Sequence, residues 1–365
     1  MSDRLDIVFL GLSITSSWGN GHATNYRGLL RALAARGHRA LFLERDKPWY
    51  AAERDLPPDL TDSVALCDSV EELADCFRER VRGADLVVVG SYVPEGVAVG
   101  RWVQEQAQGV TAFYDIDTPV TLEKLARGDY EYLEPRLIPG YDLYLSFTGG
   151  SALETLEQRY GSPAAHAFYC LVDPERYCPM ALERDLDLGY MGTYSSDRQP
   201  ALERLLLEPA QGWPQGRFAV AGPQYPPDLV WPHNIERIEH LGPDRHAAFY
   251  NRQRFTLNVT RRQMVAAGWS PSVRLFEAAA CGTPIISDWW EGLDSFFRIG
   301  EEIHVARSGA EALRLLRETP EDQRLGMAER ARSRVLAEHT AARRVEQLEG
   351  WVAEVRRCSP LGAVC

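Results

Sequence analysis

The segment Ser270-Pro-Ser-Val-Arg-Leu-Phe-Glu-Ala-Ala-Ala-Cys-Gly-Thr-Pro-Ile-Ile-Ser-Asp288 predicts a short helix that leads directly into a buried strand. Ser270 is a candidate N-cap, and Pro271 suits the first helical position. Gly282 and Pro284 are typical of a helix end, and the isoleucines that follow begin an apolar strand. A helix that stops at a glycine and continues into a buried strand indicates an α/β domain.

The start of this predicted helix is a candidate anion site. The amides of Ser272 and Val273 would lack partners inside the helix and would lie at the positive end of its dipole. At about 100° per residue, Arg274, Glu277 and Cys281 share one helix face. Glu277 then lies about two turns from the tip, which suits a nucleotide with its diphosphate at the tip and its ribose at the carboxylate. Alternatively, Arg274 and Glu277 form a surface ion pair at spacing i,i+3.

Length and composition limit the possible classes of protein. The chain has 365 residues, enough for two domains, and 45% of them are hydrophobic. Its net charge of −12 argues against sequence-independent binding to nucleic acid or anionic lipid. We expect a soluble, cytoplasmic protein, since no apolar run is long enough to span a bilayer and no signal peptide is recognisable. The seven cysteines include no Cys-x2-Cys pair, so reduced thiols and no zinc site are expected.

Strand and helix patterns alternate along the chain. The first series has strand patterns at 6–11, 39–43, 84–90, 110–114 and 141–147, and helical patterns at 24–35, 69–82, 96–106, 119–125 and 151–159. After a break near 173–179 the second series has strands at 187–192, 217–221, 235–240, 256–259 and 284–287, with helices at 200–207 and 246–252 besides the 270–282 segment. A helical tail follows at 319–357.

This alternation predicts two parallel, doubly wound sheets, that is, two Rossmann-like α/β domains. We expect an N-terminal domain over 1–180, a second domain over 181–340, and a C-terminal helix and tail over 341–365 that can pack back on the first domain. Ligands of such folds bind at the cleft between the domains and at the carboxyl ends of the strands.

Five segments resemble motifs of the GT-B glycosyltransferases. They are 16–27 (SSWGNGHATNYR), 192–198 (GTYSSDR), 238–250 (IEHLGPDRHAAFY), 257–262 (LNVTRR) and the helix segment 270–282. The likeness covers nearly the whole chain and is greatest to the spore-maturation (CgeB-like) group. It implies a bacterial enzyme of hexosyltransferase type that moves a sugar from a nucleoside-diphosphate sugar to a hydroxyl of a small molecule, glycan or protein.

The resemblance places the donor on the second domain. It implies that the nucleobase loop, the diphosphate clamp and the helix tip hold the donor through Gly192, Tyr194, Arg198, His240, Leu241, Arg261, Ser270, Ser272, Val273 and Glu277. Arg262 is less favoured than Arg261, because neighbours on a strand point to opposite faces. The alternative for each arginine is a solvated surface residue.

Two further features refine the donor site. The family motif has a glutamate eight positions before Glu277, where this chain has Trp269. The usual donor-sugar contacts and retention of anomeric configuration are therefore not carried over. The second domain has no prominent Asp-x-Asp pair, so metal independence is expected, with no cofactor besides the nucleotide-sugar co-substrate.

The acceptor side is expected in the first domain. Its glycine loop contains Trp18, Gly19, Asn20 and Gly21. His22 follows as a candidate general base, since an imidazole titrates near neutral pH; alternatively it caps the helix or lines a wall.

Asp115 and Asp117 end a strand, and either can orient His22 or accept the proton. We favour Asp117, although N-capping of the next helix is the alternative. Exposed aromatic side chains also stack on sugar rings, so the acceptor candidates include Trp49, Tyr50 and Tyr92, and those for the donor sugar include Trp289 and Trp290.

Three other functions remain open. A sugar-nucleotide epimerase or hydrolase would share the fold, and a non-catalytic nucleotide-sugar-binding protein would explain Trp269. A nicotinamide dehydrogenase is the weakest alternative. Gly11, Gly19 and Gly21 do not form Gly-x-Gly-x-x-Gly, and only Glu44 imitates the ribose-binding acid of that class.

Overall fold

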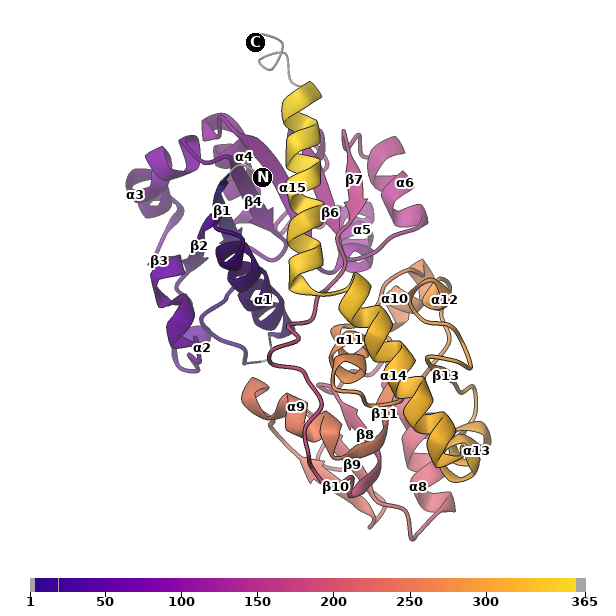
Figure 1. Cartoon of the computed structure of the whole chain (residues 1–365). Coiled ribbons are helices and arrows are strands. Elements are labelled where there is room, and N and C mark those ends of the chain that lie inside the picture. Colours follow the sequence, from indigo (N-terminus) through magenta and orange to yellow (C-terminus); the bar gives the residue numbers. More distant parts are fainter. Residues whose placement is uncertain (1–3, 19, 359–365) are drawn as a thin grey trace. The chain divides into compact units, whose positions relative to one another are not determined.

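A computed structural model describes residues 4–18 and 20–358. The chain divides into two compact units, which are described separately (Figure 1). The first unit combines Met1–Cys170 with Ala341–Cys365, and the second unit is Leu171–Thr340. The division therefore falls after Cys170 rather than after position 180, and the C-terminal helix belongs to the first unit.

The first unit contains a seven-stranded parallel sheet in the order β3-β2-β1-β4-β5-β6-β7. Its strands are β1 (Asp6–Gly11), β2 (Arg39–Arg45), β3 (Val64–Cys67), β4 (Leu86–Gly90), β5 (Val110–Asp115), β6 (Leu143–Ser146) and β7 (Ala165–Ala167). Its helices are α1 (Gly21–Ala35), α2 (Pro48–Ala51), α3 (Val70–Arg82), α4 (Gly96–Gln106), α5 (Thr118–Arg127), α6 (Ser151–Gln158) and α15 (Ala341–Cys358), with 3-10 turns at Pro58–Ser63 and Ile138–Gly140.

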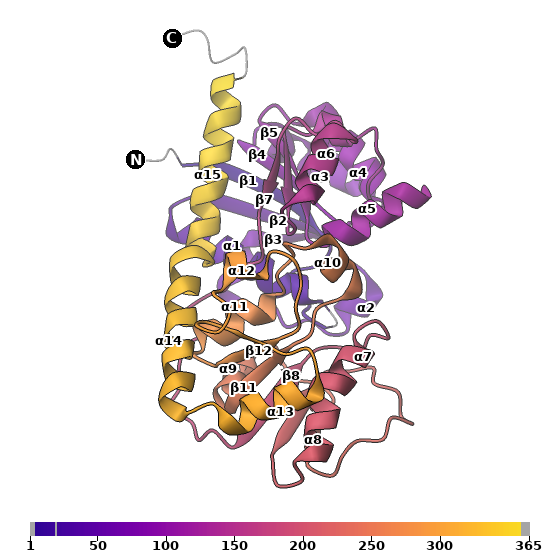
Figure 2. The same ribbon diagram turned by 90° about the vertical axis from the view of Figure 1, so that its right-hand side faces the viewer.

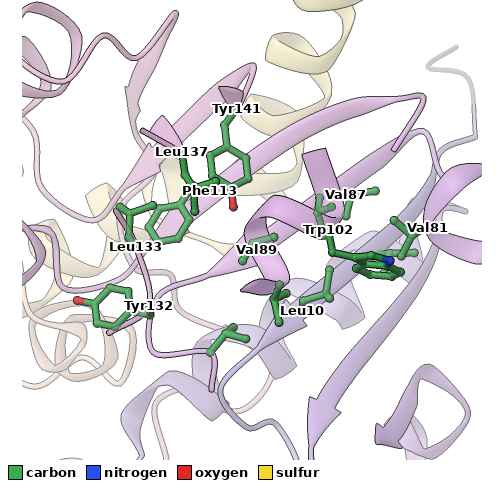
Figure 3. Packing of buried hydrophobic residues seen from close by; sticks show 14 of the residues in the cluster. Leu10, Val81, Val87, Val89, Trp102, Phe113, Tyr132, Leu133, Leu137 and Tyr141 are labelled. Carbon is green, nitrogen blue, oxygen red and sulfur yellow. The ribbon is translucent and has the colours of Figure 1, made fainter. Parts of the chain in front are cut away.

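Helices cover both faces of this sheet. On one face α1 packs against α15, and on the other α3 packs against α4 (Figure 2). The core on the α3 and α4 side includes Val87 and Val89 of β4, together with Trp102 and Phe113. Figure 3 labels these four side chains within the cluster. All five residues of β4 are buried, as a strand covered on both faces requires.

The second unit contains a six-stranded parallel sheet in the order β10-β9-β8-β11-β12-β13. Its strands are β8 (Leu186–Met191), β9 (Phe218–Ala221), β10 (Ile235–Ile238), β11 (Gln253–Asn258), β12 (Ile285–Ser287) and β13 (His304–Val305). Its helices are α7 (Gln199–Leu202), α8 (Glu208–Gly212), α9 (Pro243–Asn251), α10 (Arg262–Ala267), α11 (Val273–Ala280), α12 (Leu293–Phe296), α13 (Gly309–Glu318) and α14 (Glu321–Glu338). Figure 2 shows this sheet between α9, α11 and α14 on one side and α7, α8 and α13 on the other.

One predicted helix of the second unit is not a regular α-helix. The segment 200–207 was expected to be continuous, but a π-helical turn, η3 (Glu203–Leu207), separates α7 from α8. Pro209 explains this, because its ring nitrogen cannot donate to the helical hydrogen-bond ladder. Three buried leucines of the turn, Leu205, Leu206 and Leu207, still pack into the core.

The strand orders define where a ligand can bind. In the first sheet the order reverses between β1 and β4, and in the second between β8 and β11. At such switch points the loops that leave the carboxyl ends of the two strands diverge and open a crevice. The loops after β1 and β4 in the first unit, and after β8 and β11 in the second, therefore frame the candidate sites.

No helix within the described part of the chain has the length and apolar character that crossing a membrane requires. The six cysteines at described positions are free thiols.

Candidate functional site

The helix of the opening segment begins two residues later than expected. Its N-cap is Ser272, and α11 starts at Val273, so the prediction of Ser270 as N-cap was wrong. Trp269 explains the shift. It adopts φ 42°, and its backbone N–H donates to the carbonyl oxygen of Glu291 at 2.7 Å, which holds the preceding chain out of the helix. Gly282 does end the helix, with φ 68° as a C-terminal glycine requires.

The new boundary moves the helix tip relative to Glu277. Val273 and Arg274 now provide the first amides of the helix in place of Ser272 and Val273. Glu277 follows the N-cap by five residues, which is about 7.5 Å of helix rise. The separation is therefore shorter than the two turns expected.

Glu277 is only 3% exposed. Its Oε2 accepts a hydrogen bond from the Tyr250 hydroxyl at 2.9 Å. Burial and the nearby Glu277 raise the pKa of Tyr250, and also of Tyr177, well above the usual range, so both phenols stay protonated beside the carboxylate. Arg274 instead donates from Nη2 to the carbonyl oxygen of Val259 at 3.0 Å. The i,i+3 ion pair considered above is thus replaced by two separate sets of contacts.

Three arginines gather at the switch point of the second sheet. Arg198 lies in the loop after β8, Arg261 in the loop after β11, and Arg274 in the first turn of α11. Burial lowers the pKa of the Arg198 guanidinium, Tyr190 opposes this, and the positive charges of Arg274 and Arg261 lower it further. Positive groups gathered in this way are suited to binding an anion.

Two of these guanidinium groups have a buried N–H donor that makes no hydrogen bond to the described residues. The Nε atoms of Arg198 and Arg274 are buried and find no hydrogen-bond partner anywhere in 4–18 and 20–358. Arg198 is fixed by a bond from Nη2 to the Thr193 carbonyl oxygen at 2.7 Å, and Arg274 lies over the Tyr190 ring at 5.5 Å. Buried N–H groups without partners carry a desolvation cost that an anionic ligand would remove.

A polar network holds the loop after β11 against the tip of α11. The Ser272 hydroxyl donates to Asn258 Oδ1 at 2.6 Å, and Asn258 Nδ2 donates to the Ser287 hydroxyl at 2.9 Å. Asp288 accepts from both the backbone and the hydroxyl of Thr260, at 2.9 and 2.8 Å. These bonds fix the loop in which Arg261 lies.

Arg262 is more exposed than its neighbour Arg261. It is exposed, and its backbone N–H donates to Asp197 Oδ2 at 2.9 Å. It lines a pocket of about 420 Å³ whose wall includes Asp288 and the half-exposed Trp289. The same pocket is lined by Asp197 and Thr260, the chain neighbours of Arg198 and Arg261.

The remaining predicted donor residues lie on the loops after β8 and β10, except Ser270, which lies between α10 and α11. A Cβ on Gly192 would meet the Tyr190 hydroxyl at 2.6 Å, which explains the glycine. The Tyr194 ring packs edge-on against Tyr225 at 5.5 Å. His240 is exposed beyond β10, and the next carbonyl, that of Leu241, lies 3.2 Å from His246 Nε2. Ser270 is 4% exposed.

In the first unit the glycine loop leads straight into α1, which begins at Gly21 rather than at position 24. Asn20 is the N-cap, and its Oδ1 accepts from the His22 backbone N–H at 3.1 Å. Capping therefore belongs to Asn20 and not to the His22 side chain. Trp18 is 46% exposed, and Gly19 lies outside the described residues.

The structure brings His22 and Asp117 together. His22 Nε2 lies 3.9 Å from Asp117 Oδ2, and the two side chains are 22% and 16% exposed. Asp117 occupies the N-cap position of α5, but its carboxylate makes no capping bond. Instead Oδ2 accepts from the Tyr92 hydroxyl at 3.0 Å. An imidazole that follows β1 and a carboxylate that follows β5 are thus neighbours at the carboxyl edge of the first sheet, and both are partly exposed.

Asp115 plays a different part. It is fully buried and accepts from the hydroxyls of Tyr144 at 2.6 Å and Thr121 at 2.8 Å. Burial raises its pKa to about 6, against the lowering effect of these two bonds. Asp115 therefore belongs to the core of the unit, whereas Asp117 faces His22.

Glu44 binds the chain between β1 and the glycine loop. It is 1% exposed, and its carboxylate accepts from Ser13 Oγ, the backbone of Ile14, and both the backbone and hydroxyl of Thr15 at 2.6–3.0 Å. A carboxylate with four such donors is not available to a ribose. This contact argues against the dehydrogenase alternative.

The described residues contain no group of three or more His, Cys, Asp or Glu side chains arranged to hold a metal ion.

Comparisons with known proteins bear on the fold of the whole chain and on the class of residues 198–350. Residues 198–350 match the family model described as glycosyl transferase-like. No curated protein matches the chain. The fold is similar to that of sucrose-phosphate synthase from Thermosynechococcus elongatus, with a TM-score of 0.68 and 15% identity over 97% of this chain and 100% of that one.

Two further solved structures share the fold. Anabaena HepE in complex with UDP and glucose gives a TM-score of 0.70 and 12% identity over 96% of this chain and 100% of that one. A glycosyltransferase from Rickettsia africae gives 0.67 and 11% over 98% and 100%. At these identities the likeness shows the fold alone, which is GT-B. The family match over 198–350 adds support for a glycosyltransferase in general.

Sequence reasoning missed three residues that the structure places at these sites. Arg274 was interpreted as a possible ion-pair partner, Asn258 was not singled out, and Tyr92 was considered only as an aromatic surface. The position of Asn258 at the carboxyl end of a predicted strand was the signal available for it. The bond from Tyr92 to Asp117 joins positions 25 residues apart and has no local signal.

Proposed function

We propose that this chain is a glycosyltransferase that moves a sugar from a nucleoside-diphosphate sugar to an acceptor hydroxyl. The observation that carries the proposal is the meeting of Arg198, Arg261 and Arg274 at the switch point of the second sheet. The glycosyl transferase-like match includes all three positions. Among proteins of this fold, HepE is described in complex with UDP-glucose.

The three guanidinium groups hold the donor diphosphate. In the transition state the bond from the sugar C1 to the diphosphate oxygen breaks, and its electron pair stays on the diphosphate. Fixed positive groups lower the barrier because they stabilise this growing charge without moving. The amides of Val273 and Arg274 add the positive end of the α11 dipole.

Glu277 holds the ribose in this proposal. A carboxylate has about four acceptor positions, so it can keep the Tyr250 bond and accept a ribose hydroxyl as well. The loop with His240 and Leu241 then borders the nucleobase, because β10 ends at the same edge of the sheet as β8.

The acceptor is activated by His22. Its imidazole takes the proton from the acceptor hydroxyl as the acceptor oxygen forms its bond to the sugar C1. The imidazolium is stabilised by Asp117, whose Oδ2 lies 3.9 Å from His22 Nε2. Trp18 and Gly21 line the approach of the acceptor.

Three finer assignments complete the proposal. The reaction is metal-independent, since arginines supply the charge that a cation would otherwise provide. The sugar is a hexose, and the enzyme belongs to the CgeB-like group on the strength of the glycine loop 16–27. Trp269 replaces the first glutamate of the motif. Whether the reaction inverts or retains the anomeric configuration is therefore read from the configuration of the product.

Thermal-shift titration with nucleoside diphosphates, followed by mass spectrometry of the best donor with candidate acceptors, tests the proposal. We expect a diphosphate to raise Tm and its sugar to be transferred, with the same rate in EDTA. Isomerised donor without an acceptor would favour the epimerase, and binding without turnover would favour the non-catalytic alternative. A Tm unaffected by any nucleoside diphosphate would contradict the donor site.

A further inference from the structure

The pocket of about 420 Å³ on the second unit is rich in positive charge. Its lining includes three arginines, namely Arg204, Arg262 and Arg307. Arg204 belongs to the π-helical turn η3, Arg262 is the first residue of α10, and Arg307 follows β13 by two positions. These segments come after β8, β11 and β13 in the chain, so the pocket lies at the carboxyl edge of the sheet, where ligands of parallel sheets bind.

The three guanidinium groups make no ion pair and no hydrogen bond with the residues in 4–18 and 20–358. This is unexpected in a chain whose 52 acidic residues outnumber its 40 basic ones. Nearby carboxylates bind the backbone of these segments instead. Asp197 Oδ2 accepts from the Arg262 N–H at 2.9 Å, and Glu311 Oε2 accepts from the Arg307 N–H at 2.7 Å. The charged ends of the arginines are therefore left for a ligand.

Arg204 lies on an irregular backbone. π-helical turns are rare in soluble proteins and occur frequently at functional sites. The three leucines of η3 that follow Arg204 are buried, whereas Arg204 itself is exposed and lines the pocket. The turn thus anchors itself in the core and presents one charged side chain to the pocket.

The pocket lining also includes exposed apolar side chains. Trp289 and Val265 are 43% and 37% exposed. The adjacent Trp290 is buried and packs on Phe296 with the ring centroids 5.7 Å apart, so Trp289 is the tryptophan of this pair that a ligand can reach. An exposed indole offers a flat apolar surface on which the C–H face of a sugar ring can pack.

We propose that this pocket is a second anion site, which binds a sugar that carries a phosphate group. The arginines bind the phosphate oxygens, because a guanidinium group presents paired N–H donors that match them. Trp289 contacts the sugar ring. A volume of about 420 Å³ is within the usual range for a small-molecule site. The inference goes beyond the proposed function, since it requires neither the nucleotide nor sugar transfer.

Calorimetry of the full chain with glucose 6-phosphate tests the inference. We expect glucose 6-phosphate to bind, inorganic phosphate to bind more weakly because it lacks the ring, and glucose not to bind at the same concentrations. Arg307→Gln should weaken the binding of glucose 6-phosphate by about tenfold, the scale of a hydrogen bond between charged groups. Trp289→Ala should weaken the binding of glucose 6-phosphate and leave that of inorganic phosphate unchanged.

Arg217→Gln is the matched control. Arg217 is exposed and directly precedes β9, so it lies at the amino edge of the sheet, opposite the pocket. This variant should bind glucose 6-phosphate as the wild type does. Equal losses in Arg217→Gln and Arg307→Gln would show a diffuse charge effect and overturn the inference. Absence of glucose 6-phosphate binding would also overturn it, as would displacement by saturating UDP, which would assign the pocket to the donor site.

Discussion

The positive charge of Arg274 lowers the pKa of Arg198, and each of these two arginines keeps a buried Nε–H without a partner among the described residues. Their backbones belong to different elements, so the arrangement exists only in the folded second unit. The printed hydrogen bonds of both side chains go to carbonyl oxygens, Thr193 for one and Val259 for the other, and not to carboxylates. Their charge is therefore left for a ligand.

Arg274→Ala should weaken binding of a nucleoside diphosphate by about tenfold to a hundredfold, the usual worth of a hydrogen bond between charged groups. The loss should shrink at high salt, because screening already weakens the wild-type complex. Calorimetry measures both. Arg262→Ala is the control, since that side chain is exposed and is not among the charges that lower the pKa of Arg198, so the variant should bind as the wild type does. Equal losses in the two variants would mean a diffuse charge effect and no defined site.

Glu277→Gln should reduce affinity for a nucleoside diphosphate and have little effect on affinity for inorganic pyrophosphate, which lacks a ribose. The amide keeps the shape of the side chain but is a weaker acceptor than the carboxylate. Tyr250→Phe serves as control, because it removes the partner hydroxyl and leaves the carboxylate. If pyrophosphate binding fell as much as nucleotide binding in Glu277→Gln, the ribose role would be wrong.

His22→Ala should lower kcat by about a hundredfold or more, in the range of general-base catalysis, without weakening donor binding. The two units separate these effects, since His22 belongs to the first unit and the arginines to the second. Single-turnover rates and calorimetry with the same donor measure them. Wild-type turnover in this variant would remove His22 from the mechanism.

Asp115 should make the protein less stable as the pH rises. Its pKa is raised from 3.8 to about 6 in the folded state, so between these values the folded form holds a proton that the unfolded chain releases. At about 1.4 kcal/mol per pKa unit, the free energy of unfolding should fall by about 3 kcal/mol between pH 4 and pH 6 from this group. Urea denaturation across this range measures the slope. Asp115→Asn should flatten it, and an unchanged slope in that variant would assign the pH dependence to other groups.

Gly292→Ala should destabilise the second unit by about 1–3 kcal/mol, the cost of strained backbone and overpacking. Gly292 has φ 87°, and a Cβ there would meet the Trp269 ring at 2.4 Å. Gly350→Ala in α15 is the control. Nothing lies within 4 Å of its added Cβ, so it should raise the free energy of unfolding by about 0.5–1 kcal/mol. Chemical denaturation measures both variants. An unchanged free energy of unfolding in Gly292→Ala would show that the Trp269 ring moves aside at little cost.

Much of the fold was readable from local patterns. The strand 6–11 has the predicted bounds, and the tail is helical as expected, in α14 and α15. The strands β3 and β7 were missed, because four and three residues at a sheet edge give too short an apolar run to recognise. The interruption of the helix 200–207 depends on Pro209, which lies beyond the segment considered.

The candidate sites were readable in part. The family resemblance pointed to Arg198 and Arg261, and the glycine loop pointed to His22. In the structure these residues follow β8, β11 and β1, the strands at which the two strand orders reverse. Contacts between loops that are distant in the sequence, such as Tyr92 with Asp117, depend on the strand order and on local backbone strain. No rule based on residue spacing in the sequence predicts them. The N-cap error at Ser270 has the same origin, since a contact between Trp269 and Glu291 moved the start of the helix.

Hydrogen–deuterium exchange with and without a nucleoside diphosphate tests the central claim most directly. The account predicts protection in the loop after β8, around 192–199, and in 258–275, which covers the loop after β11 and the first turn of α11. Little change should occur at 306–307, which lie outside both segments. Protection confined to other parts of the chain, or none at saturating nucleotide, would contradict a donor site built on Arg198, Arg261 and Arg274.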